Sequence, residues 1–146
     1  MLVVSNDARL DLDRILPGHL LVVENPVRQT TVVDRLMLAL SPWSRLRGLL
    51  GRGPLEPGQG MLLRPCRQVH TFFMGHTIDV LFLRADGEVL ALEAGLRPWR
   101  MTPHVGRARC VLELADGGAA AADTRVGDTL IFRRIGQTFD RDDSSL

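Results

Sequence analysis

The sequence predicts an α+β fold dominated by strands: one curled, mostly antiparallel sheet or a small open barrel, with a short helix packed on it at about residues 42–50. Short apolar and β-branched runs alternate with glycine, proline and asparagine turns along most of the 146 residues. Only one stretch carries a clear helical pattern with a start signal. Apolar residues make up 45% of the chain and charged residues 24%, as in ordinary globular domains.

The first strands are predicted in the N-terminal third. Residues 20–23 form an apolar run that Asn25-Pro26 ends, and residues 30–33 form a β-branched run. Residues 35–40 fit either a strand or a helix, because their apolar pattern is too short to separate the two periods.

The predicted helix begins at Ser41-Pro42, an N-cap serine followed by a proline at the first helical position. Trp43, Leu46 and Leu50 then fall on one apolar face. Gly51 ends the pattern. We therefore expect a helix from Pro42 to Leu50.

The rest of the chain predicts mainly strands. They are expected at residues 61–63, 69–74, 78–84, 88–92, 110–114 and 129–133. Asp86-Gly87 predicts a hairpin with a type I′ turn, since both residues tolerate a positive φ. An alanine-rich stretch after Gly117-Gly118 allows one turn of helix.

A single domain is expected over residues 1–146, with loose order at 1–18 and 140–146. All 18 basic residues are arginine, so lysine chemistry is excluded. Cys66 and Cys110 can form at most one disulfide, and no signal sequence is recognised. We therefore expect a soluble cytoplasmic protein with two reduced thiols and no membrane partner.

Several segments together resemble the domain-of-unknown-function 192 family. They are Arg47 to Arg52, Gly60 to Leu63, His70 to Met74, Ile78 to Leu83, Asp86-Gly87, Val111 to Leu114 and Gly127-Asp128. They span about residues 35–133 in the family's order. The resemblance implies a compact, mostly β fold with a small helix, found chiefly in bacteria and archaea. It supplies no catalytic residue, substrate or cofactor.

Three residues of the predicted strand 69–74 are candidates for a ligand site. His70, Phe72 and Met74 would share one face, because side chains alternate along a strand. His70 would then line a pocket as an acid, base or ligand. Alternatively, it is a core histidine bonded to a backbone carbonyl.

Two carboxylates lie within apolar strands. Asp79 stands between Ile78 and Val80, and burying it without a partner would cost several kcal/mol. Its partner would be an arginine such as Arg47, backbone N–H groups, or His70. Glu113 stands in the same situation, although strand alternation would also let it face solvent.

Trp99 lies in a loop broken by Pro98 and Pro103, where it would form either a contact surface or a lid over the core. Cys66 and His70 have a Cys-x3-His spacing, but a structural zinc site needs four ligands. We predict no metal and no cofactor.

Three functions remain open. The leading hypothesis is a non-enzymatic module that binds an unknown small molecule or protein beside the segment from His70 to Met74 and the loop around Trp99. The second is a small hydrolase or isomerase using His70 with Asp79 or Glu113. The third is a surface for nucleic acid or another anionic partner at Arg45, Arg52, Arg97 and Arg100. Nucleic acid is disfavoured, because few aromatic residues are interleaved with those arginines, whereas single-strand binding would prefer several for stacking.

Overall fold

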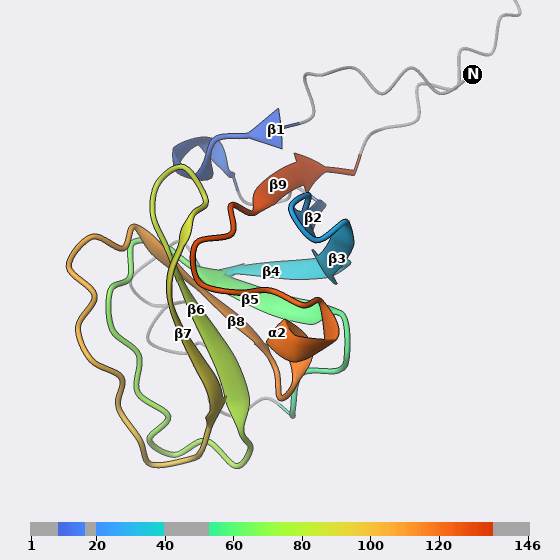
Figure 1. The fold of residues 1–146 in the computed structure, drawn as a ribbon. Helices are drawn as coiled ribbons and strands as arrows, with labels where there is room; N and C mark the ends of the chain where they lie inside the picture. The colour runs from blue at the N-terminus through green and yellow to red at the C-terminus, as the bar shows by residue number, and fades with distance from the viewer. Residues whose placement is uncertain (1–8, 17–19, 40–52, 136–146) are drawn as a thin grey trace, which may run out of the picture.

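The computed structural model describes residues 9–16, 20–39 and 53–135 (Figure 1). Strands dominate, and the predicted β-rich α+β class is confirmed. The predicted helix at 42–50 lies outside the described residues. The described elements, in chain order, are β1 (Arg9–Leu10), the 3-10 helix η2 (Leu12–Arg14), β2 (Leu21–Asn25), β3 (Thr30–Val33), β4 (Arg35–Ala39), β5 (Gln59–Leu63), β6 (Ile78–Leu83), β7 (Val89–Leu96), β8 (Cys110–Ala115), α2 (Gly118–Ala121) and β9 (Ile131–Arg134).

The described strands form two sheets in place of the single curled sheet that the sequence predicted. One has the order β1-β9-β2-β3, and the other has the order β4-β5-β8-β6-β7. All described pairs are antiparallel except β4 with β5. A second layer is needed because β6 and β8 are buried along their whole lengths, so both faces of the five-stranded sheet must be covered.

The two faces of the five-stranded sheet carry separate cores. Figure 1 shows the smaller sheet and α2 on one side of it, with the segments 64–77 and 97–109 on the other. The first core includes Leu81, Leu112 and residues of β2, β3 and β9. The second includes Val80 and Val111 under residues of the two loop segments. A side chain of β6 or β8 therefore enters one core or the other according to strand alternation.

The hairpin between β6 and β7 forms where predicted, but its turn is not type I′. Arg84 accepts a hydrogen bond from the Gly87 N–H at 2.9 Å, so Ala85 and Asp86 are the central residues. Only Gly87 has a positive φ, of 91°. A Cβ there would lie 2.3 Å from the Leu130 carbonyl oxygen, so this position requires glycine.

The strand predicted at 69–74 is wrong. Only His70 pairs with another segment, through an isolated bridge to Met101. The chain then turns, because the Thr71 carbonyl accepts a hydrogen bond from the Met74 N–H at 3.2 Å. Phe73 takes a φ of 65°, which a strand does not allow.

Candidate functional site

Thr71 joins two loops, the turn after His70 and the segment 97–100. It is fully buried. Its hydroxyl donates to the Arg97 carbonyl at 2.6 Å and accepts from the Arg100 N–H at 2.9 Å. Its backbone N–H donates to the Arg100 carbonyl at 2.8 Å, and its carbonyl accepts from the Trp99 N–H at 3.0 Å. One threonine thus holds the segment 97–100 against the turn after His70.

Four rings form a continuous cluster on these two loops. His70 stacks on Phe72 with ring centroids 4.8 Å apart, and Phe72 stacks on Trp99 at 6.1 Å. Trp99 meets Phe73 edge to face at 4.6 Å. We call these four residues the aromatic cluster. Its rings are within the distances at which aromatic pairs attract each other.

The outer part of the aromatic cluster is open to solvent. Phe73 is 76% exposed, Trp99 is 56% exposed, and the adjacent Met101 is 60% exposed. Large apolar side chains gathered on one surface are typical of sites that contact another molecule.

Two of these exposed rings stand on strained backbone. Phe73 has a φ of 65° and Trp99 a φ of 62°, in the left-handed region that bulky residues rarely adopt. Each such residue costs on the order of 1–3 kcal/mol, and such strain clusters at functional sites. Thr71 supplies hydrogen bonds that hold both turns in this conformation.

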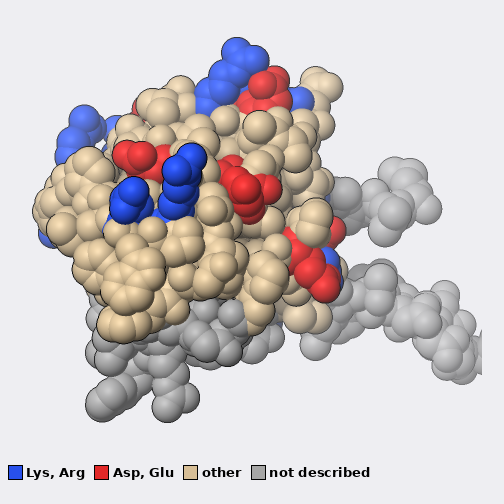
Figure 2. Space-filling model, turned by 90° about the horizontal axis from the view of Figure 1, so that it is seen from below, with Lys and Arg blue, Asp and Glu red and all other residues tan. Residues whose placement is uncertain are grey.

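Arginines flank the aromatic cluster. Arg97 and Arg100 are both exposed, on either side of Trp99 in the sequence. Figure 2, which views the molecule from below, shows arginines on this face singly or in small groups among acidic residues, next to a broad uncharged area. No continuous basic stripe crosses the visible part of this face.

Asp79 is sealed in the core between the sheets and is only 1% exposed. Its two carboxylate oxygens accept hydrogen bonds from the Gly95 N–H at 2.9 Å and the Ala119 N–H at 3.0 Å. Ala119 belongs to the first turn of α2, whose N-cap residue Gly117 has no side chain to cap it. Asp79 therefore caps the helix from a neighbouring strand and ties β6, β7 and α2 together.

Glu113 is buried on β8, with 4% of its surface exposed. It lies between Met61 on β5 and Val80 on β6. Its Oε2 atom has no hydrogen-bond partner among the described residues. Burial raises the pKa of this carboxyl to about 7, so Glu113 holds a proton more readily than an ordinary glutamate.

The acid and base candidates do not converge. Asp79 shares its face of β6 with Leu81, in the core between the sheets. Glu113 shares its face of β8 with Val111, in the core on the opposite side. His70 is exposed at the loop tip. The arrangement that a hydrolase or isomerase would need is therefore not formed by these three residues.

Of the remaining predicted site residues, only some join the aromatic cluster. Phe72 and Trp99 join His70 in the aromatic cluster. Met74 is buried in the second core because the chain turns after Thr71, so it does not share an exposed face with them. Arg47 lies outside the described residues.

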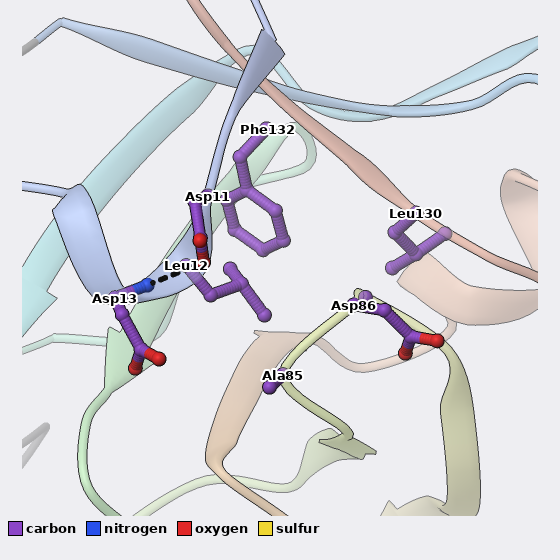
Figure 3. A pocket seen from close by; sticks show the side chains of 8 residues that line it. Asp11, Leu12, Asp13, Ala85, Asp86, Leu130 and Phe132 are labelled. Atoms are coloured by element: carbon purple, nitrogen blue, oxygen red, sulfur yellow. Dashed lines mark hydrogen bonds between the residues drawn. The ribbon is translucent and has the colours of Figure 1, made fainter.

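Neither of the two described cavities is lined by a residue of the aromatic cluster. Figure 3 shows a cavity of about 510 Å³ near η2 and the β6–β7 turn. Its carboxylates come from Asp11, Asp13 and Asp86, of which Asp13 pairs with Arg109 and Asp86 with Arg84. A second cavity, of about 460 Å³, is lined by Pro65, Cys66, Arg67, Gln68 and His104.

The two cysteines form no disulfide. Cys110 is buried, and burial raises the pKa of its thiol to about 12, which keeps it protonated.

Within residues 9–16, 20–39 and 53–135, no group of three or more histidine, cysteine or acidic residues is arranged to hold a metal ion. No described helix is long and apolar enough to cross a membrane.

A family model for DUF192, described as an uncharacterized ACR, matches residues 23–132. The chain belongs to the DUF192 family. The match begins in β2, earlier than the sequence resemblance at residue 35 suggested. A DUF192 relative, a UPF0127 protein of the archaeon Thermococcus sibiricus, is 31% identical over 114 residues, covering 73% of this chain and 71% of that protein. A UPF0127 protein of Pyrococcus furiosus is 37% identical over 67 residues, covering 46% of this chain and 57% of that protein.

A solved structure shares the DUF192 fold. It is a protein of unknown function from Novosphingobium aromaticivorans, with a TM-score of 0.65 and 23% sequence identity. The similarity covers 75% of this chain and 81% of that one. At this identity the likeness shows the fold alone.

Sequence reasoning missed three residues of this DUF192 site. Phe73 was assigned to the buried strand, although its backbone turns it to solvent. Thr71 offered no signal, because a threonine within an apolar run resembles any strand residue. Met101 was passed over in a loop. The pairing of the two loops depends on contacts 26 to 29 residues apart, which a local pattern does not show.

Proposed function

We propose that this DUF192 protein is a non-enzymatic binding module whose aromatic cluster docks onto a partner protein. One observation carries the proposal: Phe73 and Trp99 are held exposed and in mutual contact on strained backbone. Folding alone does not favour this arrangement, since a strained and exposed ring costs free energy without filling a core.

The residue types at the cluster support a protein partner. Tryptophan, phenylalanine, methionine and arginine are enriched in the centres of protein interfaces, and acidic residues are depleted there. The cluster provides Phe73, Trp99 and Met101, with Arg97 and Arg100 beside them. Truncating such anchors typically costs about 2 kcal/mol or more of binding free energy, or roughly thirtyfold in Kd.

The shape of the site favours a protein over a small molecule. Small ligands usually bind in concave pockets that bury most of their surface. Neither of the two described cavities is lined by a ring of the aromatic cluster. The exposed aromatic cluster therefore supports a protein-contact surface over the predicted groove for a small molecule. The location that we propose for this binding module is the cytoplasm, where cysteines usually stay reduced.

Photo-crosslinking tests the proposal directly. Phe73 is replaced by p-benzoylphenylalanine, which keeps a large ring at the same position, and cross-linked proteins are identified in cells by mass spectrometry. Val126 takes the same replacement as the control, because it is another apolar residue that is largely exposed, at 58%. We expect a defined protein adduct from position 73 that position 126 does not give. Equal adducts from both positions, or none from position 73, would refute the proposal.

A further inference from the structure

Arg97 and Arg100 are exposed arginines that stand two residues before and one residue after Trp99. Neither forms an ion pair with a described residue, and the Arg100 guanidinium donates to the Trp99 carbonyl at 3.5 Å. By contrast, six other arginines pair with carboxylates: Arg28, Arg35, Arg84, Arg109, Arg125 and Arg133. Five further described arginines form no ion pair with a described residue: Arg14, Arg64, Arg67, Arg107 and Arg134. Arg64 and Arg67 donate to backbone carbonyls instead. Arg97 and Arg100 are therefore distinguished by their place beside Trp99.

The backbone of both arginines is fixed even though their side chains are exposed. The Arg97 carbonyl accepts from the Thr71 hydroxyl, and both backbone groups of Arg100 bond to Thr71. The two guanidinium groups therefore start from defined points on either side of Trp99. A guanidinium at such a place is suited to bind a carboxylate through two parallel hydrogen bonds.

We infer that the partner presents an acidic peptide segment with an apolar anchor. The anchor packs against Phe73 and Trp99, and the neighbouring carboxylates pair with Arg97 and Arg100. This inference rests on the proposed function and adds the chemistry of the partner to it. Charge complementarity of this kind chiefly speeds association and selects partners.

A phosphate backbone fits the same surface less well. Proteins that bind single-stranded nucleic acid usually follow its phosphates with a continuous positively charged groove. The face in Figure 2 instead shows arginines singly or in small groups among acidic residues, so its visible part offers no continuous basic path for a phosphate backbone. Two isolated guanidinium groups match two carboxylates on a short segment.

A random-peptide display selection on the intact protein tests this inference without assuming a partner. Selected peptides are kept only if they fail to bind the Phe73→Gly/Trp99→Gly double variant. We expect the retained peptides to carry an aromatic or aliphatic residue next to aspartate or glutamate. The most enriched peptide is then labelled and titrated by fluorescence anisotropy.

The titration compares two arginine variants. We expect Arg97→Gln/Arg100→Gln to weaken peptide binding about tenfold at low salt and by less at high salt. Arg134→Gln is the matched control, an exposed arginine without an ion pair, and should leave the affinity unchanged.

The outcomes separate the two levels of the argument. Retained peptides without acidic enrichment, or equal affinity in both arginine variants, would overturn the acidic partner and leave the docking function standing. A selection that yields no peptide dependent on the rings would overturn both. Tighter binding of (dT)20, or of vesicles containing phosphatidylserine, through Arg97 and Arg100 would assign the surface to nucleic acid or lipid and overturn the inference.

Discussion

The buried strands and the loop tip each hold side chains that are unusual for their surroundings. The strands contain a buried carboxylate, whereas the loop tip carries exposed aromatic rings. In the strands, Asp79 has both carboxylate oxygens bonded to main-chain N–H groups and is shielded from solvent. At the loop tip, Thr71 uses its hydrogen bonds to hold Phe73 and Trp99 in a strained and exposed arrangement. In the strands polar groups stabilise the fold, whereas at the tip the fold supports exposed apolar groups.

This difference shows where a function is to be sought in the molecule. An ionisable group in an apolar strand draws attention in the sequence, yet Asp79 serves as a helix cap. The left-handed backbone of Phe73 and Trp99 gives no signal in the sequence, yet the exposure of rings on such backbone is not explained by the stability of the fold. The predictions below separate the two regions by the size and kind of effect that a substitution produces.

The largest effect is expected in the strands, at Asp79. Asp79→Ala removes the acceptor of the Gly95 N–H and leaves the buried N–H of Ala119 without a partner, so the free energy of unfolding should fall by about 3–5 kcal/mol. Chemical denaturation measures this loss. Asp116→Ala, an exposed control, should change stability by less than about 0.5 kcal/mol. A loss below about 1 kcal/mol at Asp79 would remove its structural role.

Glu113 should make stability depend on pH. Its pKa is about 7 in the folded protein, against an ordinary value of 4.5, so the folded state binds this proton more tightly. The contribution to stability is therefore fully present below pH 4.5 and is lost as the pH rises through 7, a change of about 3 kcal/mol.

The comparison of Glu113→Gln with the parent isolates this group. The variant stays neutral, so it should be more stable than the parent by about 3 kcal/mol at pH 8 and equal to it within about 1 kcal/mol near pH 4.5. Denaturant titrations across this range give the difference. Parallel pH profiles for the two proteins would show that Glu113 is not protonated by burial.

The strands and their class were predictable because their signals are local. The strands predicted at 78–84 and 110–114 depend on neighbouring residues, and they appear as β6 and β8. The hairpin turn forms at the predicted place, but with Ala85 and Asp86 at its centre. The division into two sheets was not predictable, since it depends on which strands pair across the chain.

The candidate site was predictable only in part. His70, Phe72 and Trp99 were identified as candidates, and the structure brings their rings together. The turn at Phe73 was missed because its cause, the bonding of Thr71 to Arg97 and Arg100, is distant in the sequence.

Thr71 should both stabilise the loop tip and hold the rings of Phe73 and Trp99 in their exposed positions. Thr71→Val keeps the volume but removes the hydroxyl, so a buried N–H and a carbonyl lose their partner and stability should fall by about 2 kcal/mol. Thr71→Ser keeps the hydroxyl and should lose about 1 kcal/mol, from the missing methyl group. Thermal denaturation compares the two. Equal losses would mean that the hydroxyl does not hold the loops.

The smallest effect on stability is expected at the rings themselves. Phe73→Gly and Trp99→Gly relieve a positive φ while they remove exposed contacts, so each should change the free energy of unfolding by less than about 1 kcal/mol. Leu81→Ala is the buried reference and should lose about 2–5 kcal/mol. If Phe73→Gly or Trp99→Gly lowered the free energy of unfolding as much as Leu81→Ala does, the rings would be part of the core. The loop tip would then not differ from the strands.

The most direct test is the yield of the cross-link from position 73 in two further backgrounds. If the exposed rings bind the partner and the buried carboxylates take no part in binding, Glu113→Gln should leave the cross-link yield unchanged and Trp99→Gly should abolish it while the protein stays folded. A cross-link that persists in Trp99→Gly and disappears in Glu113→Gln would contradict this account.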